Sequence, residues 1–138
     1  GGFMSAKLIA RPSTPFASAV SIAPVIDWRL YDTHYTERYL GRPQDAPKRY
    51  RRAGVLQMLT TRGSRALPPL LLVHGMADDN VLLDNTIQFA AKLQEKALPF
   101  ELMLYPGRAH GLRGRATRTH VWRMLTRFFE RTLAPNTR

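Results

Sequence analysis

The stretch LLLVHGMADDNV, residues 70–81, decides the fold. It is a continuous apolar run that ends in a glycine and two acidic residues, as expected for a buried parallel strand that leads into a polar loop. Residues 19–23 (AVSIA) form a second run of this kind, and residues 100–105 (FELMLY) also have the composition of a strand. We therefore predict three strands at residues 19–23, 70–74 and 100–105.

Helical patterns separate these strands. Residues 3–10 form a first helix, and a second covers residues 84–98, opening with Asp84 as its cap and stopping before Pro99. Its expected buried face consists of Ile87, Ala90, Ala91 and Leu98. The intervening region 41–68 is rich in Pro, Gly and Arg and is predicted to be loop, with a short helix possible near residues 50–59.

The last helix is amphipathic. Apolar residues recur at i, i+1, i+4, i+7 and i+8, while arginines at four-residue steps lie on the opposite side. The apolar positions are Val121, Trp122, Leu125, Phe128 and Phe129, and the arginines are Arg123, Arg127 and Arg131. The alternation of strands and helices predicts the second half of a doubly wound α/β sheet, with ligand chemistry beyond the carboxyl ends of its strands.

Composition limits the classes of function. The 138 residues, 44% of them hydrophobic, suffice for one domain or part of one. No apolar run reaches the roughly 18 residues of a membrane span, and the absence of cysteine excludes disulfides and thiolate chemistry. We expect no metal and no cofactor. The net charge of +11 is mostly arginine without interleaved aromatics, which favours solvated surfaces over a nucleic-acid partner.

Two polar residues follow neighbouring strands. Asp78 comes after the second strand and His110 after the third, one crossover of 32 residues apart. A carboxylate that meets an imidazole there would orient the ring and stabilise the imidazolium formed when the histidine takes a proton from a nucleophile. The order Asp then His is that of the α/β-hydrolases, whose serine comes first in a G-x-S-x-G elbow.

That serine is absent from this sequence. The five serines lie outside the elbow pattern, namely Ser5, Ser13, Ser18, Ser21 and Ser64. The sequence opens with Gly1-Gly2 ahead of a helix, as it would if it were cut just after the elbow serine. We therefore expect the nucleophile two positions before Gly1, and we expect the chain alone to be inactive.

Three stretches together resemble a known family. They are IAPVIDWRLYDTHYTERYLGRP (residues 22–43), HGMADDNV (74–81) and YPGRAHGL (105–112). In their order and spacing they resemble the dipeptidyl peptidase IV type catalytic domain of the prolyl oligopeptidase family. The resemblance implies that residues 1–138 are the C-terminal portion of an α/β-hydrolase domain.

The resemblance also implies roles for individual residues. Asp78 would orient the general base His110. The pocket for a proline or alanine side chain before the scissile bond would be lined by Val25, Trp28, Tyr31, Tyr35 and Val81, and Asn80 would bind a backbone carbonyl of the substrate. Aromatic faces suit a proline ring because they bury its apolar carbons. Without the resemblance, Tyr31 and Tyr35 would be interpreted as core aromatics.

The implied activity is that of a serine peptidase that releases N-terminal dipeptides with Pro or Ala second, through an acyl-enzyme. Its implied partners are a peptide substrate, a β-propeller and the serine-bearing half of the same protein, and a second copy in a homodimer. A periplasmic or extracytoplasmic location is slightly favoured. A related acylaminoacyl peptidase or oligopeptidase, and a non-catalytic homologue, are the alternatives.

The remaining acidic and histidine residues have ordinary interpretations. Asp79 is expected in a turn, and His74 is expected to be packed or hydrogen-bonded at a strand end. His34 and His120 stand in polar surroundings and should be exposed. We therefore expect one catalytic histidine, His110.

Overall fold

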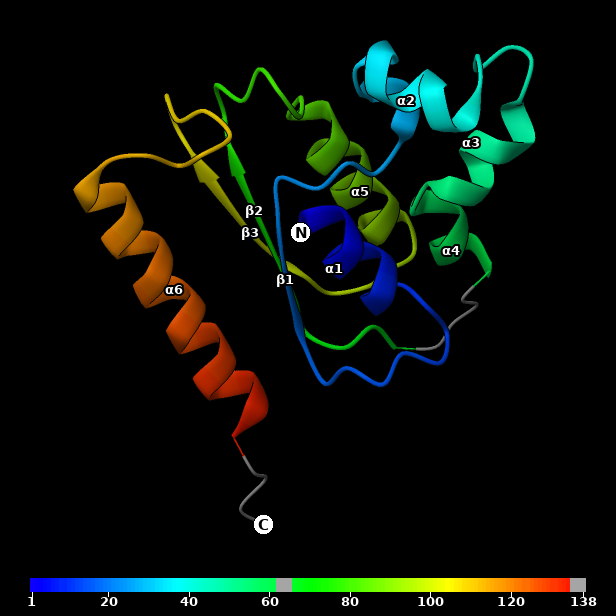
Figure 1. Cartoon of the computed structure of the whole chain (residues 1–138). Helices are drawn as coiled ribbons and strands as arrows, with labels where there is room; N and C mark the ends of the chain where they lie inside the picture. The colour runs from blue at the N-terminus through cyan, green and yellow to red at the C-terminus, as the bar shows by residue number, and fades with distance from the viewer. Residues whose placement is uncertain (62–65, 135–138) are drawn as a thin grey trace.

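The computed structural model describes residues 1–61 and 66–134 and contains a parallel sheet with helices on both faces (Figure 1). The strands are β1 (Ala19–Ile22), β2 (Leu70–Gly75) and β3 (Glu101–Tyr105), in the order β1-β2-β3. Both neighbouring pairs are parallel. The predicted α/β class is confirmed, and the strand bounds agree with the prediction to within one residue at each end.

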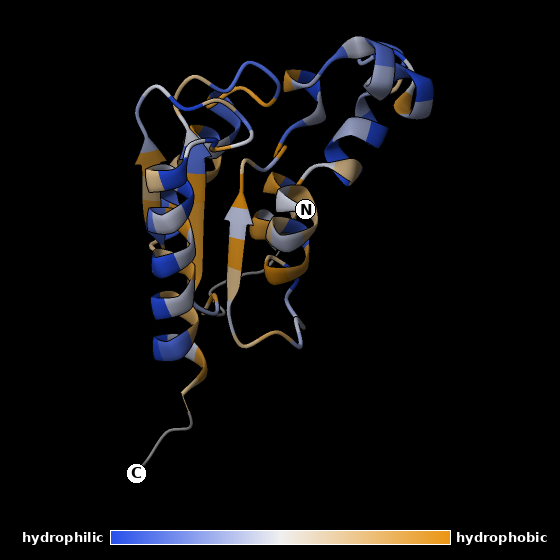
Figure 2. Cartoon of the chain, turned by 60° about the vertical axis from the view of Figure 1, so that its left-hand side comes forward, coloured by the Kyte–Doolittle hydropathy of each residue, from blue (hydrophilic) through white to orange (hydrophobic). Residues whose placement is uncertain are grey.

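The helices lie in two layers. Helix α6 (Arg115–Leu133) covers one face of the sheet, as Figure 2 shows, and the others lie on the opposite side or beyond the strand ends. These others are α1 (Gly2–Ile9), the 3-10 helix η1 (Trp28–Leu30), α2 (Thr33–Leu40), α3 (Pro47–Ala53), α4 (Leu56–Thr61) and α5 (Asp84–Glu95). Each face of the sheet is therefore covered by a helix that can bury its side chains.

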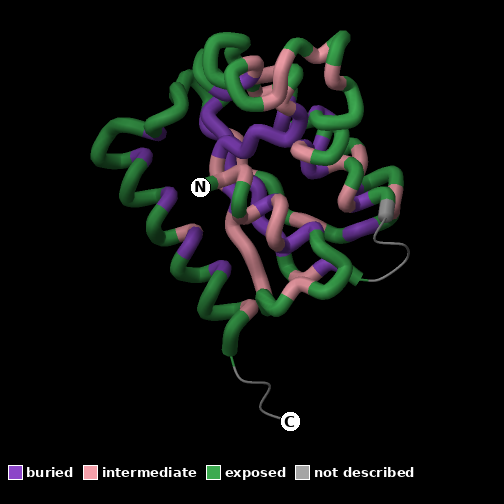
Figure 3. Tube along the Cα trace, turned by 45° about the vertical axis from the view of Figure 1, so that its right-hand side comes forward, coloured by how far each residue is buried: buried purple, intermediate pink, exposed green. Residues whose placement is uncertain are grey.

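The two faces of β2 belong to two separate cores. Leu71 and Val73 pack in the cluster under α6, whereas Leu70 and Leu72 pack with α1 and α5. Successive residues of a strand point to opposite faces, so a strand covered on both sides must be apolar throughout. Figure 3 shows the buried residues gathered between the helix layers.

The region predicted as loop contains two helices instead of one. α3 and α4 are separated at Gly54 and Val55, where the chain turns toward the backbone of Ile26. The amide of Val55 donates to the Ile26 carbonyl at 3.0 Å, and a Cβ on Gly54 would lie 3.0 Å from that oxygen. This close approach breaks what the sequence suggested as a single helix. Residues 62–65 of the predicted loop lie outside the described residues.

Two predicted features of α5 are wrong. Ile87 and Ala91 are exposed, because the buried stripe of this helix follows Thr86, Phe89, Ala90 and Leu93 at i, i+3, i+4 and i+7. The predicted cap is also wrong, since Asp84 is the first helical residue and Leu83 precedes it without a side-chain cap.

The buried stripe of α6 is narrower than predicted. Val121, Leu125 and Phe128 are buried as expected, but Trp122 is 68% exposed and Phe129 is 37% exposed. Trp122 lies beside Arg118 and Arg123 on α6. Phe129 instead lines a hollow with residues of α1 and β1.

Candidate active site

The loops that follow β2 and β3 are joined by backbone hydrogen bonds. The amide of Met76 donates to the carbonyl of Tyr105 at 2.9 Å, and the amide of Ala77 donates to the carbonyl of Arg108 at 2.9 Å. Parallel neighbouring strands bring their carboxyl ends to the same edge of the sheet. The two loops consequently form one surface above β2 and β3.

Asp78 and His110 meet on this surface. Nδ1 of His110 lies 2.9 Å from Oδ2 of Asp78, whose side chain is fully buried while that of His110 is 46% exposed. Because a carboxylate oxygen can only accept, Nδ1 must carry the hydrogen of the neutral ring. Nε2 is then the basic nitrogen, and it has no hydrogen-bond partner among the described residues. This arrangement can take a proton from a group that lies within hydrogen-bond distance of Nε2.

The other oxygen of the Asp78 carboxylate is held by its own loop. Oδ1 accepts from the backbone amides of Asn80 at 3.0 Å and Val81 at 2.9 Å. These two bonds hold Oδ1 against the backbone of its own loop, and Oδ2 faces His110. Asp79 lies exposed in the same turn and makes neither contact.

Gly75 lets the two loops approach each other. A Cβ at this position would lie 2.2 Å from the carbonyl oxygen of Arg108 and 2.9 Å from that of Ala109. The φ of Gly75 lies outside the left-handed region, so glycine is needed here only because a side chain would have no room. The last residue of β2 thus sets how close the loop of His110 comes to Asp78.

The predicted pocket aromatics form a cluster. Trp28 is the first residue of the short helix η1, Tyr31 follows its last residue, and Tyr35 comes from α2. The ring centroid of Trp28 lies 5.8 Å from that of Tyr31 and 6.0 Å from that of Tyr35, and the two tyrosine rings are 5.8 Å apart. The i, i+4 spacing of the tyrosines suggested one shared helical face, but two different elements bring them together.

One contact ties the aromatic cluster to the loop of the carboxylate. The hydroxyl of Tyr31 lies 3.3 Å from Oδ1 of Asn80, which is two residues from Asp78. The structure therefore brings Trp28, Tyr31, Tyr35 and Asn80 together beside the Asp78 loop. Trp28 and Tyr35 also line a hollow with Phe3 and further residues, namely Lys7, Thr36, Tyr39, Leu40 and Ala53.

The two valines predicted for the pocket are buried. Val25 is 6% exposed and Val81 is 3% exposed, so their side chains are part of the folded interior in this structure. Val81 directly follows Asn80, and Val25 lies three residues before Trp28. They are placed in the segments that carry the aromatic cluster and the carboxylate, and their pocket role stays a prediction.

Asn85 links the segment before η1 to the loop that follows Asp78. It is fully buried at the start of α5, and its Oδ1 accepts from the amides of Ile26 at 2.9 Å and Asp27 at 3.3 Å. Its Nδ2 donates to the carbonyl of Leu82 at 3.2 Å. One side chain thereby satisfies backbone groups of the segment before η1 and of the loop after Asp78.

An ion pair between Asp27 and Arg29 lies at the start of η1. Asp27 caps η1 by accepting from the amide of Arg29 at 2.9 Å, and its carboxylate also pairs with the Arg29 guanidinium. Burial raises the pKa of Asp27, but the hydrogen bonds and positive charge of Arg29 outweigh it, and the pKa ends below its ordinary value. The carboxylate is thus charged and bonded at neutral pH.

Three other histidines have different surroundings. His34 is exposed, as predicted. His120 is exposed too, but its Nδ1 lies 2.8 Å from the hydroxyl of Tyr105, whose pKa burial raises. His74 is fully buried and hydrogen-bonded, and it lies 3.2 Å from Asp78.

Sequence reasoning missed the contact of His74 with Asp78 and the roles of Gly75, Asn85 and Thr86. For His74 a signal was present. Alternation along residues 70–74 places it on the same face as Leu70 and Leu72, toward α5. For Asn85 and Thr86 the sequence offered only polar residues at a helix start.

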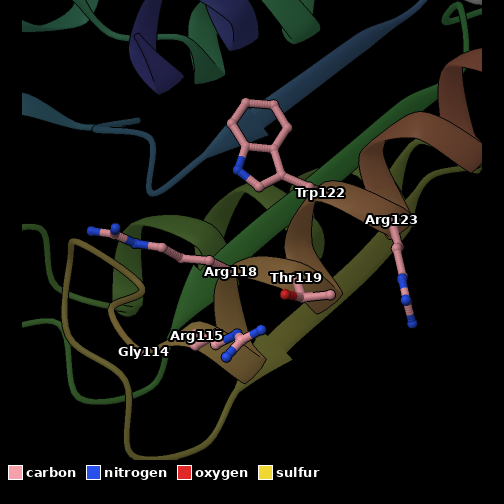
Figure 4. A pocket seen from close by; sticks show the side chains of 6 residues that line it. All are labelled: Gly114, Arg115, Arg118, Thr119, Trp122 and Arg123. Carbon is pink, nitrogen blue, oxygen red and sulfur yellow. The ribbon is translucent and has the colours of Figure 1, made fainter.

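The arginines near the start of α6 line a separate hollow, shown in Figure 4. Its walls are formed by Gly114, Arg115, Arg118, Thr119, Trp122 and Arg123. The side chains of Arg118 and Arg123 extend in different directions, and Trp122 points away from both. The charges do not converge on one point, as a site for a single anionic group would require.

The described part of the chain offers neither a metal-binding cluster nor a membrane-spanning helix. Within residues 1–61 and 66–134, no cluster of three or more His, Cys, Asp or Glu side chains is suited to hold a metal ion. No helix in the same ranges has the length and apolar character needed to cross a membrane.

Known proteins are similar to this chain in sequence and in fold. The sequence model of the Prolyl oligopeptidase family matches residues 1–136. Dipeptidyl peptidase family member 1 of Caenorhabditis elegans is 38% identical over 129 residues, which are 93% of this chain and 15% of that protein. Prolyl endopeptidase FAP of Bos taurus is 35% identical over 132 residues, 94% of this chain and 17% of that protein.

A solved structure agrees with these matches. The crystal structure of Porphyromonas gingivalis dipeptidyl peptidase 4 superimposes with a TM-score of 0.84 and 33% identity, covering 94% of this chain and 18% of that one. The chain spans less than a fifth of the length of each of these proteins. From its sequence and its fold, the chain belongs to the prolyl oligopeptidase family.

Proposed function

We propose that this chain is the C-terminal portion of the catalytic domain of a serine peptidase that releases N-terminal dipeptides with Pro or Ala in second position. The observation that carries the proposal is the 2.9 Å contact between Oδ2 of Asp78 and Nδ1 of His110 at the carboxyl ends of β2 and β3. The similarity to proteins named dipeptidyl peptidases supports the substrate class.

The proposed chemistry is acyl transfer. The serine, in a segment that would precede Gly1, attacks the carbonyl carbon of the second substrate residue, and its proton passes to Nε2 of His110. The peptide C–N bond then breaks, and the leaving nitrogen takes that proton. Water hydrolyses the resulting ester by the same route. Asp78 holds the ring and stabilises the imidazolium in both halves of the reaction.

The proposed pocket is the aromatic cluster beside the Asp78 loop. Trp28, Tyr31 and Tyr35 offer flat apolar faces to a proline ring, which has no backbone hydrogen to donate. Asn80 is proposed to donate from its side-chain amide to a backbone carbonyl of the substrate, with Oδ1 engaged by Tyr31 at 3.3 Å. Val25 and Val81 are proposed to back these rings.

The full-length protein that carries this chain would test the proposal with two matched substrates. A chromogenic Xaa-Pro dipeptide with a free amino terminus should be cleaved, whereas the same compound with a blocked amino terminus should not. Cleavage of both at equal rates would contradict the dipeptidyl activity while leaving a peptidase. Cleavage of neither would contradict the peptidase.

A second candidate is internal cleavage after proline. It is favoured by the 35% identity to a relative named prolyl endopeptidase FAP. Both candidates share Asp78, His110 and a proline pocket, and they differ in whether a free amino terminus is required. Preferential cleavage of the blocked substrate would therefore select the endopeptidase.

We further propose two macromolecular contacts. β1 is an edge of the sheet in this chain, so a strand from the serine-bearing segment could pair with it. The exposed Trp122 and Leu133 on α6 offer an apolar surface for a second copy. Sedimentation velocity of the full-length protein should give a dimer, and a monomer at micromolar concentration would contradict the second contact.

Substituting Gly75 with alanine tests how the two loops are spaced. The added Cβ would meet the Arg108 carbonyl at 2.2 Å, so the loop of His110 must shift. A displacement of about 1 Å at a reacting group can lower the rate by roughly 10²-fold. We expect kcat to fall by about that factor in a folded Gly75→Ala protein.

Gly107→Ala is the matched control, because its Cβ would meet nothing within 4 Å. Its positive φ of 64° disfavours alanine, so some loss of stability is expected without the clash. Equal kcat losses in the two variants would show that the spacing set by Gly75 has no special role.

Substituting Asn85 with leucine tests the link beneath the pocket. The amides of Ile26 and Asp27 would lose their shared acceptor inside the protein, which costs about 1–3 kcal/mol per buried group. We expect a lower melting temperature and a raised KM for the Xaa-Pro substrate. Gln88→Leu, at an exposed position of the same helix, should change neither.

A further inference from the structure

His74 is the one imidazole of this site with no part in the proposed proton transfer. It belongs to β2, is fully buried and points to the side of α5. Both ring nitrogens are engaged: Nδ1 lies 2.6 Å from Oγ1 of Thr86, and Nε2 lies 2.9 Å from the carbonyl oxygen of Val81. Nε2 also lies 3.2 Å from Oδ2 of Asp78.

The chemistry of these partners sets the direction of each hydrogen bond. The carbonyl oxygen of Val81 only accepts, so Nε2 of His74 must carry a hydrogen. In the neutral ring Nδ1 is then an acceptor, and the hydroxyl of Thr86 donates to it. Thr86 is fully buried in the first turn of α5, so this hydroxyl is shielded from bulk solvent.

The bonds continue from His74 to the proposed catalytic acid. Val81 accepts from His74 through its carbonyl, and its amide donates to Oδ1 of Asp78 at 2.9 Å. The other carboxylate oxygen, Oδ2, faces both the Nε2–H of His74 and the Nδ1–H of His110. The loop from Asp78 to Val81 is thus closed at both ends by one buried ring.

We infer that His74, oriented by Thr86, is a positioning residue that holds the Asp78 carboxylate in the rotation in which Oδ2 faces His110. The inference rests on the proposed function. It gives a role to two residues, His74 and Thr86, that neither contact the substrate nor take part in the proton transfer. An ordinary core histidine would need only to be hydrogen-bonded. This one is hydrogen-bonded to the Val81 carbonyl in the loop of the acid, and its Nε2 lies 3.2 Å from Oδ2 of the acid itself.

The test uses the full-length protein and variants of Thr86. Thr86→Val keeps the shape but removes the hydroxyl, so Nδ1 of His74 loses its donor and the ring can turn. Thr86→Ser keeps the hydroxyl. The loss of one buried hydrogen bond should lower kcat of Thr86→Val about tenfold, with KM within about twofold of the parent value. Thr86→Ser should have the kcat of the parent protein.

Two further readouts separate positioning from stability. Labelling by diisopropyl fluorophosphate joins the serine oxygen to phosphorus, releases fluoride and passes the serine proton to His110, without using the peptide pocket. Its rate should fall with kcat in Thr86→Val. The far-downfield proton resonance of the imidazole N–H bonded to Asp78 should broaden or shift in Thr86→Val and remain in Thr86→Ser.

Ala91→Gly is the control for stability, because Ala91 is an exposed interior position of the same helix and glycine there weakens the helix alone. It should melt earlier and keep its kcat and labelling rate. If Thr86→Val labels as fast as the parent protein, or if Ala91→Gly loses activity to the same extent, the inference is wrong. If the parent protein itself is not labelled, the proposed function fails as well.

Discussion

Substituting His110 with alanine should lower kcat of the full-length protein by about 10⁶-fold, the loss measured when the base of a serine protease triad is removed. His110 presents Nε2 without a partner in the described chain, while Asp78 holds Nδ1 at 2.9 Å. No other described histidine contacts Asp78 from an exposed position. The measurement is steady-state cleavage of the chromogenic Xaa-Pro substrate, with the melting temperature checked for each protein.

His34→Ala provides the control for His110→Ala. His34 is exposed in α2 and lies outside the contacts of Asp78, so its removal should leave kcat within about twofold. If His110→Ala retained more than about one hundredth of the parent kcat, His110 could not be the general base, and the proposed mechanism would have to be abandoned.

Substituting Asp78 with asparagine should lower kcat by about 10⁴-fold, as the equivalent change does in other triads. An asparagine side chain places either an amide oxygen or an NH₂ group near Nδ1 of His110. With NH₂ at that position the imidazole must accept there and carry its hydrogen on Nε2. The nitrogen that should receive the serine proton would then be occupied, although the fold is unchanged.

The neighbouring substitution Asp79→Asn separates this role from a general effect of charge. Asp79 has the same side chain one position further along the loop, but it is exposed and has no contact with His110. We expect normal kcat in Asp79→Asn. A loss shared equally by both variants would point to the total negative charge of the loop, and would remove the reason for choosing Asp78.

The strands could be predicted because each is short, apolar and bounded by polar or glycine residues. In β2 both faces are covered, so the whole run 70–74 is apolar up to His74 and stands out from its surroundings. The contact of Asp78 with His110 followed from the same reasoning. Neighbouring parallel strands have their carboxyl ends at the same edge of the sheet, so residues that directly follow two such strands lie close together.

The helix faces were harder to predict, because several alternative faces fit a short amphipathic segment. In α5 the apolar Ile87 was expected to be buried but is exposed, whereas the polar Asn85 and Thr86 are buried, since they satisfy Ile26 and His74. Burial of a polar side chain is favourable only where it finds a hydrogen-bond partner. That partner comes from another part of the fold and leaves no local sign in the sequence.

The break between α3 and α4 had a similar cause. The sequence from Tyr50 to Leu59 is compatible with a continuous helix apart from Gly54, which a helix can tolerate at a modest loss. What ends the helix there is the approach of the chain to the Ile26 carbonyl. A tertiary contact of this kind overrides local propensity and is invisible until both segments are placed.

The four residues from Asp78 to Val81 serve both the proposed proton transfer and the proposed substrate pocket. Asp78 serves the proposed proton transfer, while Asn80 touches Tyr31 and Val81 accepts from His74. Directed evolution of substrate preference at positions 80 and 81 would therefore disturb turnover together with selectivity. Tyr35, which is carried by α2, is a better position for a library, because its backbone is held by Asp32 and not by the Asp78 turn.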